Sequence, residues 1–304
     1  MSIQTNTVLF LMGPTASGKT DLAIALSKQF PARLISVDSA LIYKGMDIGT
    51  AKPNAETLKK YPHHLINIRN PEESYSAHDF AKDAKAQIKI AFEKGETPIL
   101  VGGTSFYFNA LEHGLSTLPE STPESREKFN QLLQEKGVTA LHHDLEKIDP
   151  QSAQRIHPND AQRITRALEV FDISKKTLSQ LQGNKQAGLI HPIKKIILMP
   201  PRPELHARIE RRFLSMINND FLTEVKALKT NPNLHPDLPA IRCVGYRQAW
   251  QYLNNEINQA EMIEQAIIAT RQLCKRQSTW LRNEKDALTL ETPIIAKVLE
   301  FLEK

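Results

Sequence analysis

Short apolar runs alternate with a helical pattern in the first third of the chain. Residues 7–12, 33–38 and 97–101 are rich in aliphatic and β-branched side chains, which is typical of strands buried on both faces. Between the last two runs, residues 76–95 have the 3.6-residue period of an amphipathic helix, with Ser76 as a suitable N-cap. Strands that alternate with helices predict an α/β fold with a parallel sheet.

The pattern changes at about residue 116. A Pro-rich turn segment is followed by helical patterns with almost no β-branched run as far as residue 192. Residues 194–202 then predict another core strand, and a long amphipathic helix is expected from Pro203 to about Leu228, with further helices beyond it. We therefore expect a core formed by residues 1–115 and 193–304, interrupted by an all-helical insertion domain at 116–192.

Composition excludes several classes of protein. The chain has 304 residues, 40% of them apolar, which supports an ample buried core and argues against disorder. No apolar run approaches the roughly 18 residues of a membrane-spanning helix, and no basic region precedes the short N-terminal apolar run. Cys243 and Cys274 form no CxxC pair, which argues against zinc and disulfides. We expect a soluble cytoplasmic protein without membrane contact.

Charge is distributed unevenly along the chain. Residues 1–150 carry 16 basic and 18 acidic side chains, a net charge of −2, whereas residues 151–304 carry 23 and 16, a net charge of +7. All but three arginines lie between Arg155 and Arg282. This asymmetry leaves two interpretations open: a surface for phosphates or nucleic acid, or a solvated helical face.

A phosphate-binding loop follows the first predicted strand and opens a helix. It matches GxxxxGK[ST] in full; its residues are Gly13, Pro14, Thr15, Ala16, Ser17, Gly18, Lys19 and Thr20. Backbone amides and the helix N-terminus would hold a diphosphate, Lys19 would neutralise its oxygens and Thr20 would coordinate Mg²⁺. The alternative is a glycine-containing turn with no ligand.

One element of ordinary P-loop NTPases is missing. The third predicted strand ends in Gly102 and Gly103 where those enzymes carry an acidic residue that helps to hold Mg²⁺. Asp38, at the end of the second strand, is open to three interpretations. It could be a metal ligand as in small-molecule kinases, a general base beside the phosphate site, or a turn or N-cap aspartate.

Six segments together resemble the bacterial tRNA dimethylallyltransferases over almost the whole chain and in the family's order. They are residues 13–20, 38–53, 102–111, 157–170, 242–250 and 275–282. The resemblance implies a P-loop NTPase-like fold that binds dimethylallyl diphosphate in place of ATP, with Mg²⁺ as cofactor. The implied acceptor is the exocyclic amine of the adenosine 3′ of the anticodon (tRNA position 37), in tRNAs that read codons beginning with U. We expect a monomer that binds the tRNA anticodon stem-loop.

The resemblance also implies site residues. Asp38 would take the proton of the weakly nucleophilic adenine amine, Thr104 would lie at the reaction centre, and Arg212, favoured over Arg208, would stabilise the departing diphosphate. The implied tRNA-binding residues are Asp38, Ser39, Ala40, Leu41, Thr104, Gln162, Arg163, Ile164, Thr165, Arg166, Arg242, Cys243, Val244, Gly245, Tyr246, Arg247, Lys275, Arg276, Gln277, Ser278, Thr279, Trp280, Leu281 and Arg282.

Some residues also have simpler structural interpretations. Trp280 could stack on a base, but a tryptophan in a helix more often packs in the core. The pairs His63-His64 and His142-His143 have no third ligand at suitable spacing, so we expect surface or capping roles on loops or helix ends. Asp160 lies within the start signal of a helix that contains Arg163 and Arg166, which would share one face.

Three other functions remain open. An adenylate dimethylallyltransferase would share the phosphate loop and Asp38 but would not need the arginine-rich second half. A P-loop kinase of a small metabolite would use ATP, against which the strand ending in Gly102-Gly103 argues weakly. In a non-enzymatic RNA-binding module, the intact phosphate loop would serve no purpose.

Overall fold

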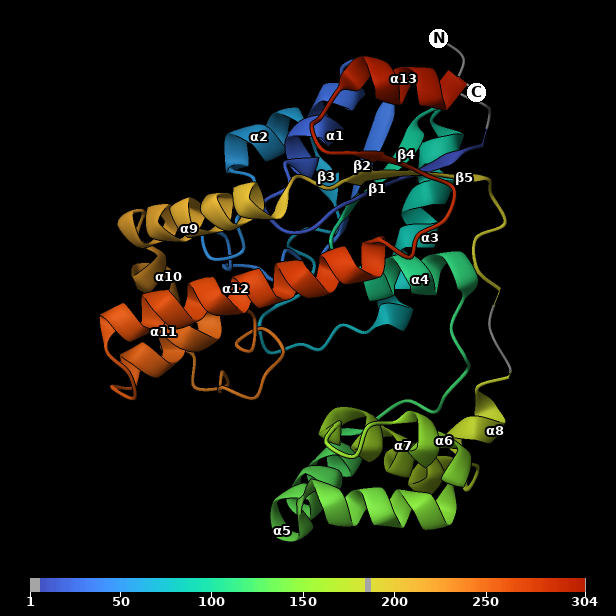
Figure 1. Ribbon diagram of the computed structural model, residues 1–304, viewed down its shortest axis with the longest axis vertical. Helices are drawn as coiled ribbons and strands as arrows, with labels where there is room; N and C mark the ends of the chain where they lie inside the picture. Colours follow the sequence, from blue (N-terminus) through green and yellow to red (C-terminus); the bar gives the residue numbers. More distant parts are fainter. Residues whose placement is uncertain (1–5, 184–186, 304) are drawn as a thin grey trace. The chain divides into compact units, whose positions relative to one another are not determined.

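The computed structural model describes residues 6–183 and 187–303, and these fall into two compact units. The core unit comprises Met1–Glu112 and Leu189–Lys304, and the helical unit comprises His113–Gly188. Figure 1 shows the helical unit in green and yellow-green. Each unit has its own hydrophobic core.

A six-stranded parallel sheet forms the centre of the core unit, which confirms the predicted fold class. Its order is β3-β2-β4-β1-β5-β6. The strands are β1 Val8–Met12, β2 Ala32–Val37, β3 His63–His64, β4 Thr97–Gly102, β5 Ile193–Leu198 and β6 Ala287–Leu290. Because β2, β4 and β1 are neighbours and run parallel, the loops after their carboxyl ends meet at one edge of the sheet, where α/β proteins bind ligands.

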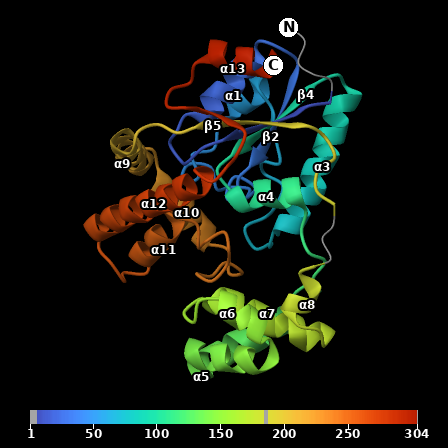
Figure 2. The ribbon, with the colours of Figure 1, turned by 45° about the vertical axis from the view of Figure 1, so that its right-hand side comes forward.

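Side chains alternate between the two faces of the sheet. Leu9 and Leu11 pack with α1 (Lys19–Ser27) and α13 (Ile295–Glu303), whereas the Phe10 ring lies 4.9 Å from that of Phe108 in α4 (Ser105–His113). Figures 1 and 2 accordingly show α1 and α13 on one face, and α3 (Ala77–Glu93) with α4 on the other. The sheet is therefore covered on both faces, as its apolar strands predict.

Helix termini follow local signals closely. Ser76 accepts from the Asp79 amide and Asp79 accepts from the Ser76 amide, which is a capping box at the predicted start of α3. Gly95, just beyond this helix, has a φ of 67°. The short helix α2 spans Ala55–Lys60 and is capped by Asn54.

A second hydrophobic cluster holds the helices of the C-terminal part together. They are α9 Arg202–Asn218, α10 Phe221–Lys229, α11 Tyr246–Leu253 and α12 Gln259–Leu281. The prediction of one continuous helix over 203–228 is wrong, because Asp220 adopts a φ of 64° and the chain turns between α9 and α10. This turn lets Phe221 pack edge-on against both Phe213 and Tyr246.

In the helical unit, the described residues form four helices around a core of their own. They are α5 Pro123–Ile148, kinked at Gly137, α6 Pro150–Arg155, α7 Ala161–Ser174 and α8 Leu178–Leu181. Asp160 caps α7 through the Arg163 amide, as its sequence signal predicts. Of the surface and capping roles expected for His142, the surface role is wrong, because its ring is buried with Nε2 3.2 Å from the carbonyl oxygens of Ala153 and Ile156, at the C-terminal end of α6.

Two strands escaped prediction. His63 and His64, expected on a loop or helix end, pair with β2 as the two-residue strand β3. Residues 287–290 pair with β5 as β6, in a region where only helices were expected. In the described ranges 6–183 and 187–303, no helix has the length and apolar character needed to cross a bilayer.

Candidate active site at the phosphate loop

The loop between β1 and α1 adopts the backbone conformation that an anion site requires. Ala16 and Gly18 have φ values of 64° and 92°, in the left-handed region. A Cβ atom on Gly13 would lie 2.5 Å from the Leu198 carbonyl oxygen, so only glycine fits there. The first N–H groups of α1 have no acceptor within the helix and point beyond its N-terminus. The loop is thus shaped to bind a phosphate or diphosphate.

Lys19 lies folded against its own loop. Its Nζ donates to the Pro14 carbonyl oxygen at 2.7 Å and lies 3.5 Å from Ser17 Oγ. Burial lowers the pKa of Lys19 to about 8, with Asp38 raising it and Arg212 lowering it. Lys19 is therefore within electrostatic reach of both side chains, and it carries a poorly hydrated positive charge at pH 7 that an anion would stabilise.

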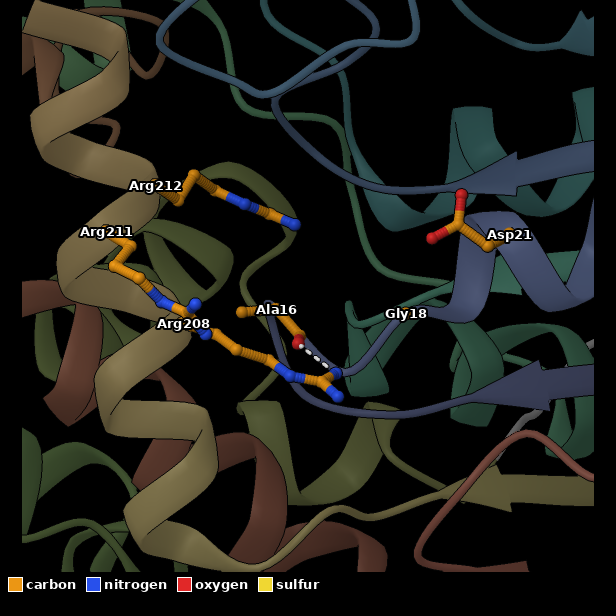
Figure 3. Close-up of a pocket in the computed structure, with 6 residues that line it drawn as sticks. All are labelled: Ala16, Gly18, Asp21, Arg208, Arg211 and Arg212. Atoms are coloured by element: carbon orange, nitrogen blue, oxygen red, sulfur yellow. Dashed lines mark hydrogen bonds between the residues drawn. The ribbon is translucent and has the colours of Figure 1, made fainter.

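Three arginines of α9 line a pocket beside the phosphate loop. The pocket, of about 390 Å³ at the mouth of the loop, is lined by Ala16, Gly18, Asp21, Arg208, Arg211 and Arg212 (Figure 3). Arginines at i, i+3 and i+4 share one helix face. The helix itself is held by a small cluster of Ala16, Leu205, Ile209 and Cys274. The phosphate loop, α9 and α12 are therefore held together by this apolar cluster.

Arg208 and Arg212 make different contacts there. Arg208 Nη1 donates to the carbonyl oxygens of Ala16 and Ser17, at 3.3 Å each, and Nη2 pairs with Glu204. Arg212 extends from α9 over the pocket in Figure 3 and forms no salt bridge in the described part of the chain. Arg208 thus supports the loop, whereas the Arg212 guanidinium is available to a ligand. Prediction from sequence missed Arg211, which its spacing from Arg208 would have indicated.

Asp38 and Thr104 meet because β2 and β4 are adjacent. Asp38 Oδ1 accepts from the amides of Ala40 at 2.8 Å and Leu41 at 3.3 Å, and Thr104 Oγ1 accepts from the Ser39 amide at 3.2 Å. These bonds tie the Thr104 hydroxyl to the turn that holds the Asp38 carboxylate. Among the residues the structure describes, Asp38 Oδ2 has no hydrogen-bond partner, so it is free to accept a proton or a hydrogen bond from a substrate.

Two groups within electrostatic reach of Asp38 stay neutral. Burial, reinforced by the Asp38 charge, raises the pKa of Cys243 to about 12. Burial also raises the pKa of Tyr107, with Tyr43 and Asp38 adding to the effect. Asp38 is therefore within electrostatic reach of the cationic Lys19 and of two groups that stay uncharged. Such a combination suits a substrate with an anionic end and an apolar or aromatic end.

Gln277 belongs to this site and not to an exposed surface. Its Oε1 accepts from the Thr15 amide and its Nε2 donates to the Gly103 carbonyl oxygen, each at 2.9 Å. Sequence prediction placed Gln277 among tRNA-binding residues only, with no indication of these two contacts. No cluster of three or more His, Cys, Asp or Glu side chains suited to a metal occurs within residues 6–183 and 187–303.

The other predicted tRNA-binding residues of the core unit divide by exposure. The exposed ones are Ser39, Arg242, Arg247, Lys275, Arg276, Thr279 and Arg282. Tyr246, Ser278 and Leu281 are buried, so the structure corrects the prediction that these side chains meet RNA. Tyr246 instead donates from its hydroxyl to Glu224, whose carboxylate also accepts the amides of residues 47–49. Trp280 is half-buried.

The predicted tRNA-binding residues of α7 also divide. Gln162 and Arg163 are exposed, and Arg163 Nε lies 3.3 Å from Asp160. Ile164 is a fully buried core residue, so the prediction that its side chain binds tRNA is corrected. Arg166 is bound to Glu169 and to the Pro119 carbonyl oxygen. The Thr165 hydroxyl donates to the Ala161 carbonyl oxygen at 2.8 Å. Of the five, only Gln162 and Arg163 present side chains free enough for a new partner.

Comparison with known proteins identifies the family. Residues 41–284 match the family model described as IPP transferase. The chain belongs to this family. It is 73% identical over 303 residues to a protein of Ruthia magnifica subsp. Calyptogena magnifica named tRNA dimethylallyltransferase, covering 99% of both chains. A protein of the same name from Vesicomyosocius okutanii subsp. Calyptogena okutanii is 69% identical, again with 99% of both chains covered.

Solved structures of IPP transferases agree with the fold. The tRNA isopentenylpyrophosphate transferase of Bacillus halodurans matches with a TM-score of 0.71 and 33% identity, covering 98% of this chain and 97% of that one. A eukaryotic dimethylallyltransferase acting on tRNA matches with a TM-score of 0.75 and 26% identity, covering 91% of this chain and 70% of that one. The α/β core of this chain is thus shared with both solved structures.

Proposed function

We propose that this protein transfers a dimethylallyl group from dimethylallyl diphosphate to the exocyclic amine of the adenosine 3′ of the anticodon, in tRNAs that read codons beginning with U. One observation carries the proposal. The phosphate loop with its arginine pocket and the Asp38–Thr104 pair follow adjacent strands, so an anionic leaving group and a proton acceptor can serve one reaction centre. The names of the relatives with 73% and 69% identity support the same activity.

The donor's diphosphate fits the cationic side of the site. Loop amides, Lys19 and Arg212 can neutralise charge that grows as the carbon–oxygen bond breaks. β4, beside β1, ends at Gly102 with no carboxylate. A kinase or ATPase normally places an acidic residue there to hold Mg²⁺ and arrange attack on a phosphate. In the proposed reaction the nucleophile attacks a carbon atom, so an acidic residue at the end of β4 is not needed.

The residues at the loop fit a Mg²⁺ ion that takes most of its ligands from the diphosphate and water. Thr20, in the first turn of α1, is half-buried and offers a hydroxyl oxygen, and Asp21 lines the same pocket. No denser carboxylate cage exists among the described residues. When bound, the ion supplies further neutralisation of the leaving diphosphate.

On the acceptor side, Asp38 and Thr104 act on the adenine amine. Its nitrogen attacks the allylic carbon, so a carbon–nitrogen bond forms while the bond between that carbon and the diphosphate oxygen breaks. Asp38 Oδ2 takes the proton that the amine loses, and the Thr104 hydroxyl orients the base or the diphosphate. The two amides bonded to Oδ1 hold the carboxylate in place for this transfer.

An adenosine in a stacked anticodon loop must be extruded to reach Asp38. The exposed cationic residues Arg242, Arg247, Lys275, Arg276 and Arg282 are available to hold the phosphates of that loop. In the helical unit, Arg163 with its neighbour Gln162 is the part of α7 that can do the same. We expect the protein to act as a monomer in the cytoplasm.

The experiment is a reconstituted transfer reaction. Purified protein, Mg²⁺ and labelled dimethylallyl diphosphate are supplied with an unmodified tRNA with adenosine 3′ of its anticodon, the same tRNA with guanosine there, or free AMP. Label should enter the first RNA only. Modification of AMP with none of tRNA would instead establish an adenylate dimethylallyltransferase, and hydrolysis of ATP with phosphorylation of a metabolite would establish a kinase.

A further inference from the structure

Gln277 of α12 joins two loops that are far apart in the sequence. Its amide oxygen accepts from the Thr15 backbone amide in the phosphate loop, and its amide nitrogen donates to the Gly103 carbonyl oxygen beside Thr104. Both bonds are 2.9 Å long. Glutamine presents an acceptor and a donor at one end, and here each is used. The orientation of the amide is fixed by its partners, since Thr15 can only donate and Gly103 can only accept.

The Gln277 amide packs closely against Gly103. A Cβ atom on Gly103 would lie 2.4 Å from Gln277 Nε2 and 3.1 Å from the Gly13 carbonyl oxygen. One turn earlier on α12, Cys274 is buried against Ala16 of the phosphate loop and two residues of α9. Apolar packing therefore fixes the position of α12 against the phosphate loop. The hydrogen bonds of Gln277 then fix the positions of Thr15 and Gly103 relative to α12.

The two loops carry the two halves of the proposed chemistry. Residues 13–20 hold the leaving diphosphate, and Gly103 precedes Thr104, whose hydroxyl accepts from Ser39 in the turn that orients Asp38. A shift of Gly103 relative to Thr15 would therefore change the distance between the proton acceptor and the leaving group. Misplacement of reacting groups by about 1 Å can cost about a hundredfold in rate.

We propose that Gln277 is a positioning residue that sets the separation of the phosphate loop from the Asp38–Thr104 pair, and that it does not bind tRNA. The proposal rests on the proposed function for the identity of the two reacting sides. It differs from the expectation drawn from sequence, which placed Gln277 with the RNA contacts of Lys275 and Arg276. The reason is that the Gln277 side chain is already bonded to two backbone groups of the core unit.

Three variants test this role. Gln277→Leu removes both hydrogen bonds at nearly the same volume. Gln277→Glu keeps an oxygen that can accept from the Thr15 amide, but it has no N–H to donate to the Gly103 carbonyl oxygen. It also adds negative charge beside the diphosphate site. The matched control is Gln272→Leu, the same change at an exposed position of the same helix. Thermal melting of each protein verifies that it is folded.

For each variant, kcat for dimethylallyl transfer at saturating substrates is compared with two affinities. Filter binding gives the affinity for tRNA, and calorimetry gives the affinity for inorganic pyrophosphate with Mg²⁺. For Gln277→Leu we expect kcat to fall about ten- to a hundredfold, pyrophosphate affinity to fall about tenfold, and tRNA affinity to stay unchanged. Gln277→Glu should bind pyrophosphate more weakly still, and Gln272→Leu should match the unaltered protein.

Two results would overturn the proposal. Weakened tRNA binding with an unchanged kcat at saturation would make Gln277 an RNA contact. Gln277→Leu behaving as Gln272→Leu in every assay would leave it without a role. If the unaltered protein transfers no dimethylallyl group to tRNA, the proposed function fails, but the pyrophosphate measurement still decides whether Gln277 positions the phosphate loop.

Discussion

Two helices of this protein carry arginines at helical spacing, and they use them in opposite ways. In α7, Arg166 is bound to Glu169, whose side chain is only 6% exposed. In α9, Arg211 and Arg212 line a pocket at the phosphate loop and form no salt bridge within the described residues. An arginine bound to a buried carboxylate holds a fold together, whereas one left unpaired beside a helix N-terminus creates positive potential for a ligand.

The comparison extends to the two units. In the core unit, polar groups converge on one edge of the sheet, and some of their atoms, such as Asp38 Oδ2, have no hydrogen-bond partner among the described residues. In the helical unit, the polar network of Glu169, Ser121 and Arg166 is closed on itself. We therefore expect substitutions in the first network to change chemistry or diphosphate binding with little effect on folding, and substitutions in the second to change stability.

The largest effect is expected at Asp38. Asp38→Ala removes the proton acceptor, so kcat should fall about 10²- to 10⁴-fold, while calorimetry with pyrophosphate and Mg²⁺ should give an unchanged affinity. Asp38→Asn is the matched control for shape, since it retains an oxygen for the amides of Ala40 and Leu41 and should be equally inactive. Loss of pyrophosphate binding in both variants would instead make Asp38 part of the metal and diphosphate site.

Next is the pair Arg212 and Arg208. Arg212→Ala should weaken pyrophosphate binding about ten- to a hundredfold with little change in melting temperature, since its guanidinium holds no protein group in place. Arg208→Ala should also lower the melting temperature, because Arg208 supports the carbonyl oxygens of Ala16 and Ser17. The same melting and calorimetric measurements serve both. Equal loss of affinity with equal loss of stability would remove the distinction between them.

The third prediction concerns pH. Burial holds the pKa of Lys19 at about 8 in the free protein. Above that pH the amine is neutral and must gain a proton to bind an anion, so pyrophosphate affinity relative to that of Lys19→Arg should fall, approaching tenfold per pH unit, and this ratio should stay level below pH 8. Lys19→Arg experiences the same titration of the ligand but keeps its charge. Coinciding pH profiles for the two proteins would show that Lys19 does not titrate in this range.

A feature of the fold can be predicted from the sequence when the interactions that cause it are local. The phosphate loop, the Ser76 and Asp160 caps and the apolar strands follow from short-range sequence patterns, and the structure bears them out. The four-residue strand β6 has no such pattern, and it pairs only because β5 offers an edge. Tyr246 lies in a basic segment, yet its ring fills a core that residues 47–49 and 221 also form. Tertiary packing decides such positions.

The same limit applies to the candidate site. The end of the second strand pointed to Asp38 and the family resemblance to Thr104, but their link through Ser39 depends on β2 and β4 being neighbours. The role of Gln277 could not be read from its segment, because its partners Thr15 and Gly103 are distant in sequence.

The fourth prediction is a contrast in stability within α7. Arg166→Ala leaves the buried Glu169 carboxylate with Ser121 as its remaining partner, so the free energy of unfolding of the helical unit should fall by about 2 kcal/mol. Urea denaturation followed by circular dichroism measures it. Arg163→Ala is the matched control, since Arg163 is exposed and its removal should change stability by less than about 0.5 kcal/mol.

The smallest effect is expected on tRNA binding by Arg163. If Arg163 contacts a phosphate, Arg163→Ala should weaken tRNA binding by a few-fold and reduce the slope of log affinity against log salt by about one. Filter binding over a range of salt concentrations gives this slope. An unchanged slope would assign Arg163 to a solvated face that has no part in RNA binding.

The central claim is that tRNA is the acceptor and that the adenosine 3′ of the anticodon is modified. Mass spectrometry of nuclease fragments is the most direct measurement, made on unmodified tRNA incubated with the protein, Mg²⁺ and dimethylallyl diphosphate. We predict isopentenyladenosine at that one position, absent when Asp38→Ala replaces the unaltered protein. Unmodified tRNA alongside prenylated AMP, or a modified base elsewhere in the tRNA, would contradict the account.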